Sequence, residues 1–253
     1  MAAISLDFTG KNVVITGGTG GIGRACAEGV VKGGGRAVIV DLSSELGEKA
    51  CAELGGPEHA LFYRMDQGST QEIESVFASI IADVGQIHSL INCAGIVSTR
   101  SFEDLPQAEW ERVINVDLTG VFTCCKIAYQ HMAEHRCGHI VNIASVAAVT
   151  GGGFLGTAAY VSAKAGVIGL SKAIAREGAS KGVNCVAVNP GGIWTNILNK
   201  LDDEILSKIK AAIPMGHFCT SEDCANVVLF YASDLASFVT GNVAYCDGGM
   251  TRA

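Results

Sequence analysis

The sequence predicts an α/β protein in which a doubly wound, seven-stranded parallel sheet carries helices on both faces. Apolar runs of strand length alternate with amphipathic segments of helical length along all 253 residues. Such alternation is typical of a parallel sheet whose strands are joined by crossover helices. A glycine-rich turn also follows the first apolar run and precedes the first helix, as in folds that bind dinucleotides.

Each predicted strand is a short apolar run, and each predicted helix repeats apolar residues with a period of about 3.6 residues. The predicted strands are residues 12–16, 36–40, 60–65, 89–92, 139–144, 184–189 and 242–246. The predicted helices are residues 21–32, 45–54, 69–84, 108–133, 158–181 and 221–232. No repeat, low-complexity tract or linker interrupts the series, so we expect a single dinucleotide-binding and catalytic domain over residues 1–253.

Polar and turn residues gather at the carboxyl ends of the predicted strands, where open α/β sheets bind their ligands. These residues are Gly17, Asp41, Asp66, Asn92, Ser145, Pro190 and Gly191. Two long connections, residues 146–157 and 192–220, begin at the same edge. Because long loops in compact domains are usually functional, we expect these two to flank a substrate cleft.

Composition excludes several classes of protein. The chain is 49% hydrophobic and 17% charged, with a formal net charge of -7 and no basic run. This balance argues against nucleic acid or an anionic membrane as the main partner. The first residues lack the pattern of a secretion signal, and no later run is both long and apolar enough to span a bilayer. We expect a cytoplasmic protein with a small-molecule substrate.

The spacing of the ten cysteines and six histidines favours neither disulfides nor a metal site. No C-x-x-C pair occurs, and we expect buried, reduced thiols at Cys26, Cys93, Cys185 and Cys246. His131 and His135 have a spacing that suits a metal on a helix, but no H-E-x-x-H motif is present. His217, Cys219 and Cys224 lack a recognisable fourth ligand. We therefore predict no metal.

The glycine turn, residues 16–23 with the sequence T-G-G-T-G-G-I-G, predicts a dinucleotide site. Its glycines let the backbone approach a pyrophosphate, and the following helix offers N–H groups and a partial positive charge. Asp41 ends the next predicted strand, 41 − 23 = 18 positions after Gly23, where a ribose-binding carboxylate is expected. The alternative for Asp41 is a helix N-cap, but Ser43 and Ser44 are available for that role.

The charge of Asp41 predicts NAD rather than NADP as the cofactor. A 2′-phosphate beside this carboxylate would place like charges at roughly 4 Å, which costs about 1 kcal/mol in water and about 4 kcal/mol near a protein surface. Gly18, Thr19 and Gly20 also provide no cation to pair with the extra phosphate.

Tyr160 and Lys164 lie four positions apart and share one face of a predicted helix. An ammonium held near a phenol stabilises the phenolate, so that the phenol can act as a base nearer neutral pH. The pair therefore predicts proton transfer to or from an alcohol or a ketone. The alternatives are a half-buried helical tyrosine and a solvated surface lysine.

These two motifs and five shorter ones occur in the order typical of the short-chain dehydrogenases/reductases. The shorter motifs are residues 92–95, 115–118 and 142–145, Pro190 and Gly191 with Thr195, and residues 247–249. The sequence resembles that family over nearly its whole length. The resemblance implies a Rossmann-type fold and a nicotinamide-dependent oxidoreductase.

The resemblance implies a catalytic tetrad of Asn115, Ser145, Tyr160 and Lys164. Tyr160 would exchange a proton with the substrate oxygen, and Ser145 would hydrogen-bond that oxygen as charge develops on it. Lys164 would hold the nicotinamide ribose and favour the phenolate. Asn115 would position a water that relays the proton.

The resemblance also implies the contacts of the cofactor. The pyrophosphate would lie against Gly17, Gly21, Ile22 and Gly23. The adenosine half would contact Asp41 and Asp66, and the nearer ribose would contact Asn92 and Gly95. Tyr160 and Lys164 would also contact the cofactor, with Lys164 at the nicotinamide ribose. The nicotinamide would be held by Pro190, Ile193 and Thr195.

The chain departs from the family pattern at two places. Cys93 stands where the second asparagine of N-N-A-G is usual, which removes one hydrogen bond from that loop. The spacing from Ser145 to Tyr160 is longer than the family usually has, with the extra residues in the stretch 151–157. We expect a longer loop at the mouth of the substrate pocket.

We therefore predict an NAD-dependent oxidoreductase that interconverts a secondary alcohol and a ketone. Three alternatives stay open: a non-catalytic NAD(H)-binding redox sensor, an epimerase or dehydratase with tightly held NAD, and a 3-oxoacyl thioester reductase. The thioester activity is less favoured by the sequence. Such reductases usually prefer NADPH and need a basic surface for an acidic carrier protein.

Small residues at Ala165, Gly169 and Ala173 form a stripe along the helix predicted at residues 158–181. The stripe could pack on the chain's own sheet or contact another subunit. The family resemblance favours an interface made with the helix that contains Asn115, and we predict a homotetramer.

Overall fold

The computed structural model describes residues 5–153, 156–194 and 202–251, and its seven strands form one parallel sheet, as predicted. The sheet has the order β3-β2-β1-β4-β5-β6-β7, which places the change of winding direction between β1 and β4. The strands are β1 (Asn12–Thr16), β2 (Arg36–Asp41), β3 (Ala60–Arg64), β4 (Ser89–Asn92), β5 (Gly138–Ile143), β6 (Val183–Pro190) and β7 (Val243–Cys246). This is a Rossmann-type architecture.

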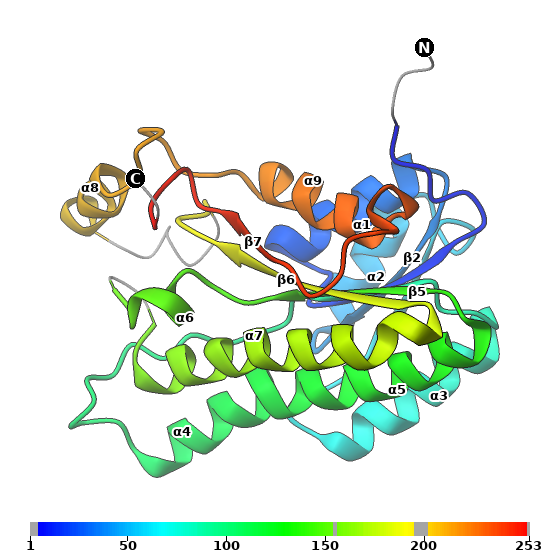
Figure 1. The fold of residues 1–253 in the computed structure, drawn as a ribbon, viewed down its shortest axis with the longest axis horizontal. Coiled ribbons are helices and arrows are strands. Elements are labelled where there is room, and N and C mark those ends of the chain that lie inside the picture. Colours follow the sequence, from blue (N-terminus) through cyan, green and yellow to red (C-terminus); the bar gives the residue numbers. More distant parts are fainter. Residues whose placement is uncertain (1–4, 154–155, 195–201, 252–253) are drawn as a thin grey trace.

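Helices cover both faces of the sheet, which also confirms the predicted fold class (Figure 1). One face carries α1 (Gly21–Lys32), α2 (Ser44–Glu53) and α9 (Ser221–Ala232). The other face carries α3 (Thr70–Val84), α5 (Gly120–His135) and α7 (Ala158–Gly178). The shorter helices are α4 (Gln107–Ile114), α6 (Ala147–Thr150) and α8 (Asp203–Ala211).

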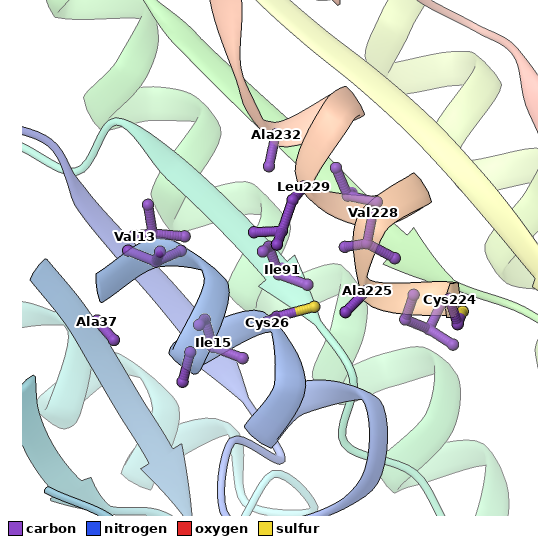
Figure 2. Close-up of a cluster of buried hydrophobic side chains, with 14 of the residues drawn as sticks. Val13, Ile15, Cys26, Ala37, Ile91, Cys224, Ala225, Val228, Leu229 and Ala232 are labelled. Atoms are coloured by element: carbon purple, nitrogen blue, oxygen red, sulfur yellow. The ribbon is translucent and has the colours of Figure 1, made fainter. Parts of the chain in front are cut away.

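Alternation along the strands divides the core into two clusters, one on each face of the sheet. Successive side chains of a strand point to opposite faces. Val13 and Ile15 of β1 pack in the cluster that includes Cys26 of α1 and residues of α9 (Figure 2). Val14 packs on the opposite face with Phe77 of α3. Burial on both faces explains why the strands read as continuous apolar runs.

The helix predicted over residues 108–133 is interrupted. A π-helical turn, Asn115–Thr119, separates α4 from α5 and turns Asp117 into the interior, where its side chain is 0% exposed. A π-bulge adds one residue to a helical turn, and the apolar pattern used for the prediction did not locate that residue. The helix predicted over residues 158–181 likewise ends at Gly178, before a 3₁₀ turn at Ala179–Lys181.

Both predicted long connections contain a helix that the sequence analysis missed. α6 lies within residues 146–157, and α8 lies within residues 192–220. The Asp202 side chain caps α8 by accepting a hydrogen bond from the Ile205 N–H at 2.8 Å, and acidic residues occupy its first turn. These were available signals for a helix start, and the shortness of α8 concealed them.

All ten cysteines are free thiols. Cys26 and Cys185 are buried as predicted, but Cys93 and Cys246 are only partly buried, contrary to the prediction. Cys93 directly follows β4 and Cys246 ends β7, where the carboxyl edge of the sheet meets solvent. None of the helices in the described ranges is long and apolar enough to cross a membrane.

Leu229 tests the packing of α9 on α1. Its side chain is 2% exposed, and a Cβ added at Gly29 would lie only 2.2 Å from its Cδ1, so the two helices are in close contact (Figure 2). We expect Leu229→Ala to lower the free energy of unfolding by about 2–5 kcal/mol, measured by urea denaturation. Leu235→Ala, at a side chain that is 46% exposed, is the matched control and should change it by about 0.5 kcal/mol or less.

Candidate active site

A cavity of about 620 Å³ opens beyond the carboxyl ends of β1, β4, β5 and β6. Its lining brings together most of the residues predicted to react or to hold the cofactor. These are Gly17, Gly21, Ile22, Gly23, Gly95, Ser145, Tyr160, Lys164, Pro190 and Ile193. Thr195 was predicted to join them, but it lies outside the described residues. The segments concerned are far apart in sequence and meet only because parallel strands end at one edge.

A second cavity of about 790 Å³ adjoins the first. The two share the lining residues Gly17, Gly20, Cys93 and Gly95. Asp41 and Asp66, predicted to contact adenosine, line the second cavity, whereas Tyr160 and Lys164 line the first. The predicted adenosine and nicotinamide contacts therefore lie on opposite sides of the glycine turn.

The backbone of the glycine turn has the shape that an approaching pyrophosphate requires. Gly17 has φ +66°, and an added Cβ would lie 2.7 Å from the Ala94 backbone nitrogen, so only glycine fits there. A Cβ at Gly23 would lie 2.2 Å from the Gly17 carbonyl oxygen, which shows how closely α1 packs against the turn. A Cβ at Gly20 would meet no atom within 4 Å, which leaves the turn open toward both cavities. These residues fit a dinucleotide.

Asp41 is held at the end of β2 by the glycine turn. Its Oδ2 accepts hydrogen bonds from the Thr19 hydroxyl at 2.7 Å and the Thr19 N–H at 3.2 Å, and its Oδ1 accepts the Leu42 N–H at 2.7 Å. The N-cap alternative is excluded, because Ser43 caps α2 by accepting the Leu46 N–H at 3.3 Å. Thr19, whose contact with Asp41 the sequence analysis did not foresee, fixes the carboxylate beside the second cavity.

Asp66, which follows β3, and Asn92, which ends β4, differ in their surroundings. Asp66 lines the second cavity, and its Oδ1 accepts the Gly68 N–H at 2.8 Å. Asn92 is 2% exposed, and its Nδ2 donates to Asn142 Oδ1 at 2.7 Å. Asn92 is not among the residues that line the two cavities, and its predicted ribose contact stays a prediction. Its amide joins β4 to β5 in the core.

Lys164 is almost fully buried, with a relative exposure of 4%. Its Nζ donates to the Ile143 carbonyl oxygen at 3.2 Å and lies 3.4 Å from Asp117 Oδ2. Burial lowers the pKa of Lys164, but the neighbouring charges of Asp117 and Tyr160 and the contact with Asp117 outweigh it and hold this pKa above its usual value. These contacts favour the ammonium form of Lys164.

Tyr160 and Ser145 line the same cavity. Tyr160 is half-buried at the start of α7, and Lys164 Nζ lies 5.7 Å from the centre of its ring. Ser145 follows β5, and its Oγ accepts the Ala147 N–H at 3.1 Å. That bond uses the oxygen as an acceptor, so the O–H of Ser145 is left to donate to a ligand.

The structure separates Asn115 from the rest of the predicted tetrad. Asn115 is exposed at the start of the π-helical turn and lines the second cavity, not the first. Two residues later, Asp117 is fully buried and contacts Lys164. The relay role of Asn115 stays a prediction, and the residue of the π-helical turn that contacts Lys164 is Asp117. Nothing in the local sequence marks that choice.

The described residues contain no group of three or more His, Cys, Asp or Glu side chains arranged to hold a metal ion. His131, one of the histidines considered for a metal, instead accepts the Ile87 N–H on its Nε2 at 3.2 Å. His217 has its ring nitrogen Nδ1 3.0 Å from the Phe218 carbonyl oxygen.

The chain is similar in sequence and in fold to known proteins. A family model described as enoyl-(acyl carrier protein) reductase matches residues 17–251. The 3-oxoacyl-[acyl-carrier-protein] reductase FabG of Aquifex aeolicus is 38% identical over 251 residues, covering 98% of this chain and 100% of the relative. FabG of Salmonella typhimurium is 37% identical over 246 residues, covering 97% and 99%. The crystal structure of gox2181 superposes with a TM-score of 0.93 at 30% identity and 97% coverage of both chains.

Proposed function

The chain belongs to the short-chain dehydrogenase/reductase family of nicotinamide-dependent oxidoreductases, and on that premise we propose that it reduces a 3-oxoacyl thioester to the 3-hydroxy product with NADH. The observation that carries the reaction type is the meeting of Ser145, Tyr160 and Lys164 with the glycine turn in one cavity. The names of relatives that match nearly the whole chain favour the thioester substrate. This reverses the ranking made from the sequence, which preferred a free secondary alcohol.

The side chains of the first cavity supply the proton transfer. In reduction, the Tyr160 hydroxyl donates its proton to the ketone oxygen, while the Ser145 hydroxyl donates a hydrogen bond to the same oxygen as negative charge develops. The Lys164 ammonium stabilises the phenolate that remains. In oxidation, the phenolate takes the hydroxyl proton. The nicotinamide cofactor, when bound, supplies or accepts the hydride.

The cofactor is NAD(H) in this proposal. Gly17, Gly21, Ile22 and Gly23 would hold the pyrophosphate, with the adenosine near Asp41 and Asp66. The Asp41 carboxylate, fixed by Thr19 and Leu42, would repel a 2′-phosphate.

The substrate would enter between the connections at residues 146–157 and 192–220. The described residues of these segments that line the first cavity are mostly small or apolar. They include Val146, Ala147, Ile193, Ile209 and Ala212. An apolar wall suits the carbon chain of a short acyl group, whose transfer from water is favourable.

A second candidate is oxidation of a small, free secondary alcohol with NAD. The position of Asp41 favours this second candidate. Its carboxylate selects against NADP, and the oxidation of an alcohol uses the oxidised cofactor NAD. The same catalytic side chains serve both candidates. Only the substrate distinguishes them.

The stripe of Ala165, Gly169 and Ala173 supports a homotetramer. All three residues are exposed in the single chain, which excludes packing on the chain's own sheet. Phe122 of α5 is 47% exposed, so a second helix on this side of the sheet also presents an apolar side chain. If another subunit approached closely along this stripe, the contact would bury both the stripe and the Phe122 side chain.

Tyr160→Phe tests the reaction. With acetoacetyl-CoA and NADH, we expect the purified protein to oxidise NADH and the variant to lose at least about 100-fold in kcat, because a positioned general acid is removed. Tyr129→Phe is the matched control and should keep wild-type turnover, since Tyr129 bonds the Glu177 carbonyl oxygen away from both cavities.

A panel of secondary alcohols with NAD separates the candidates. Turnover of alcohols without reduction of acetoacetyl-CoA would support the second candidate and reject the first. Binding of NADH without turnover of any substrate would indicate a redox sensor and reject both.

Asp41→Asn tests the choice of cofactor. Removing the carboxylate charge should lower the preference for NAD over NADP by roughly tenfold to a thousandfold. This range follows from the Coulomb cost of a carboxylate and a 2′-phosphate at roughly 4 Å. The measurement is the ratio of kcat/KM with NADH to that with NADPH. Thr19→Val removes the hydroxyl that binds Asp41 but keeps the charge, so it should leave the ratio in favour of NADH. An unchanged ratio in Asp41→Asn would contradict the assignment.

Ala165→Arg tests the subunit interface. The substitution places a charged side chain on the exposed stripe, so we expect smaller assemblies than the wild-type tetramer in sedimentation velocity. A wild-type protein that sediments only as a monomer at micromolar concentration would reject the tetramer.

A further inference from the structure

Five thiols from separate parts of the chain interact with one another on the face of the sheet that carries α1 and α9. They belong to Cys26 of α1, Cys93 after β4, Cys219 before α9, Cys224 of α9 and Cys246 of β7. Figure 2 shows Cys26 and Cys224 among the side chains of this cluster. The reaction described above uses none of these thiols.

Cys219 and Cys246 form a close pair within this group. Their Sγ atoms lie 3.7 Å apart. Both residues are only partly buried, whereas Cys26 and Cys224 are buried, so a small solute can reach the pair from solvent. A disulfide brings two sulfurs to about 2.05 Å, and rotation about the Cα–Cβ bonds covers most of the remaining distance. The two thiols are therefore placed to form a disulfide.

The neighbouring thiols favour a thiolate at Cys246. Hydrogen bonds from Cys219 and Cys224 lower the pKa of Cys246, and they outweigh burial and the charges of Asp223 and Asp247. The same hydrogen bonds raise the pKa of Cys219 and that of Cys224. Because the thiolate is the reactive form of cysteine, Cys246 is the member of the pair that reacts first.

The backbone of the same pair supports the wall of the first cavity. The Gly191 N–H donates to the Cys246 carbonyl oxygen at 3.0 Å, and the Cys219 N–H donates to the Gly192 carbonyl oxygen at 3.0 Å. The Trp194 N–H donates to the Cys219 carbonyl oxygen at 2.9 Å. Gly191 and Gly192 line the first cavity. A bond between the two sulfurs would thus join the two sides from which this segment is held.

We propose that Cys219 and Cys246 are a redox-active pair that a hydroperoxide oxidises to a disulfide, and that this disulfide restrains residues 190–194 at the wall of the first cavity. The pair takes no part in hydride or proton transfer. This role goes beyond the proposed function and does not depend on the substrate or the cofactor.

The oxidation takes place in two steps. The Cys246 thiolate attacks one oxygen of the hydroperoxide, so that an S–O bond forms, the O–O bond breaks and the leaving oxygen takes up the proton that Cys246 lost. Cys219 then attacks the sulfur of the Cys246 sulfenic acid, so that the S–S bond forms and the S–O bond breaks. The departing hydroxide takes the proton of Cys219 and leaves as water. Together the two thiols lose two electrons, and the hydroperoxide is reduced.

Peptide mapping after treatment with hydrogen peroxide tests the link. Free thiols are blocked with N-ethylmaleimide, and the protein is cut after glutamate and after aromatic residues. Glu222 lies between Cys219 and Cys224, and Phe238 lies between Cys224 and Cys246, so the three cysteines fall in different peptides. We expect the peptides of Cys219 and Cys246 to appear joined, with a mass lower than their sum by two hydrogen atoms, and to separate after reduction with dithiothreitol.

Serine variants assign the two roles. Cys219→Ser should prevent the link and leave a sulfenic acid on Cys246, which dimedone labels. Cys246→Ser should prevent both the link and the labelling. Cys224→Ser, whose hydroxyl can still donate a hydrogen bond to Cys246, should form the link. Cys137→Ser is the matched control at an exposed thiol before β5, and it should form the link as the wild-type protein does.

Amide hydrogen exchange measures the effect on the cavity wall without any ligand. In the peptide that covers residues 190–194, we expect exchange to be at least about threefold slower in the oxidised than in the reduced wild-type protein, because the added bond limits local opening. Reduction should restore the faster exchange. In Cys246→Ser, treatment with peroxide should leave the exchange of this peptide unchanged.

Three results would overturn the proposal. The first is the absence of a link between Cys219 and Cys246 under conditions that oxidise Cys137. The second is a link that joins Cys246 to Cys224 instead of Cys219. The third is a link between Cys219 and Cys246 that leaves the exchange of residues 190–194 unchanged. Because neither measurement uses substrate or cofactor, failure of the proposed function would change none of these results.

Discussion

The buried ammonium of Lys164 ties the candidate active site to the fold. Its partners come from three separate elements: the Ile143 carbonyl from β5, the Asp117 carboxylate from the π-helical turn, and the Tyr160 ring from α7 itself. A charge so enclosed is stable only when all of these are in place. The reactive arrangement therefore exists only after the sheet, the bulged helix and α7 have packed together.

The sheet supplies the second constraint, because it brings distant segments to a common edge. Both faces of β1 are covered by helices, so the only open approach to this strand is at its ends. At the carboxyl end, Gly17 closes against the Ala94 backbone and Asp41 is fixed by Thr19. A bound dinucleotide would thus meet a surface whose parts are already positioned, which reduces the entropy lost on binding.

Local patterns predicted most of the fold and part of the site. The strands follow from apolar runs, and Tyr160 and Lys164 follow from a spacing of four on one helix, so their proximity needs no tertiary information. Asn92 and Asn115 could not be placed this way. Asn92 points into the core toward Asn142 of a neighbouring strand, and Asn115 lies at a π-helical turn within a segment predicted as one continuous helix.

The sequence by itself determined the fold class, the glycine turn, the carboxylate at Asp41 and the tyrosine and lysine pair, because each depends on contacts between residues close in the chain or on periodicity. Only the tertiary structure decided which acidic or amide group stands behind Lys164. That choice depends on how one widened helical turn packs against α7 and the segment after β4, and packing between distant segments leaves no trace in local spacing. Asp117 is accordingly a property of the folded chain.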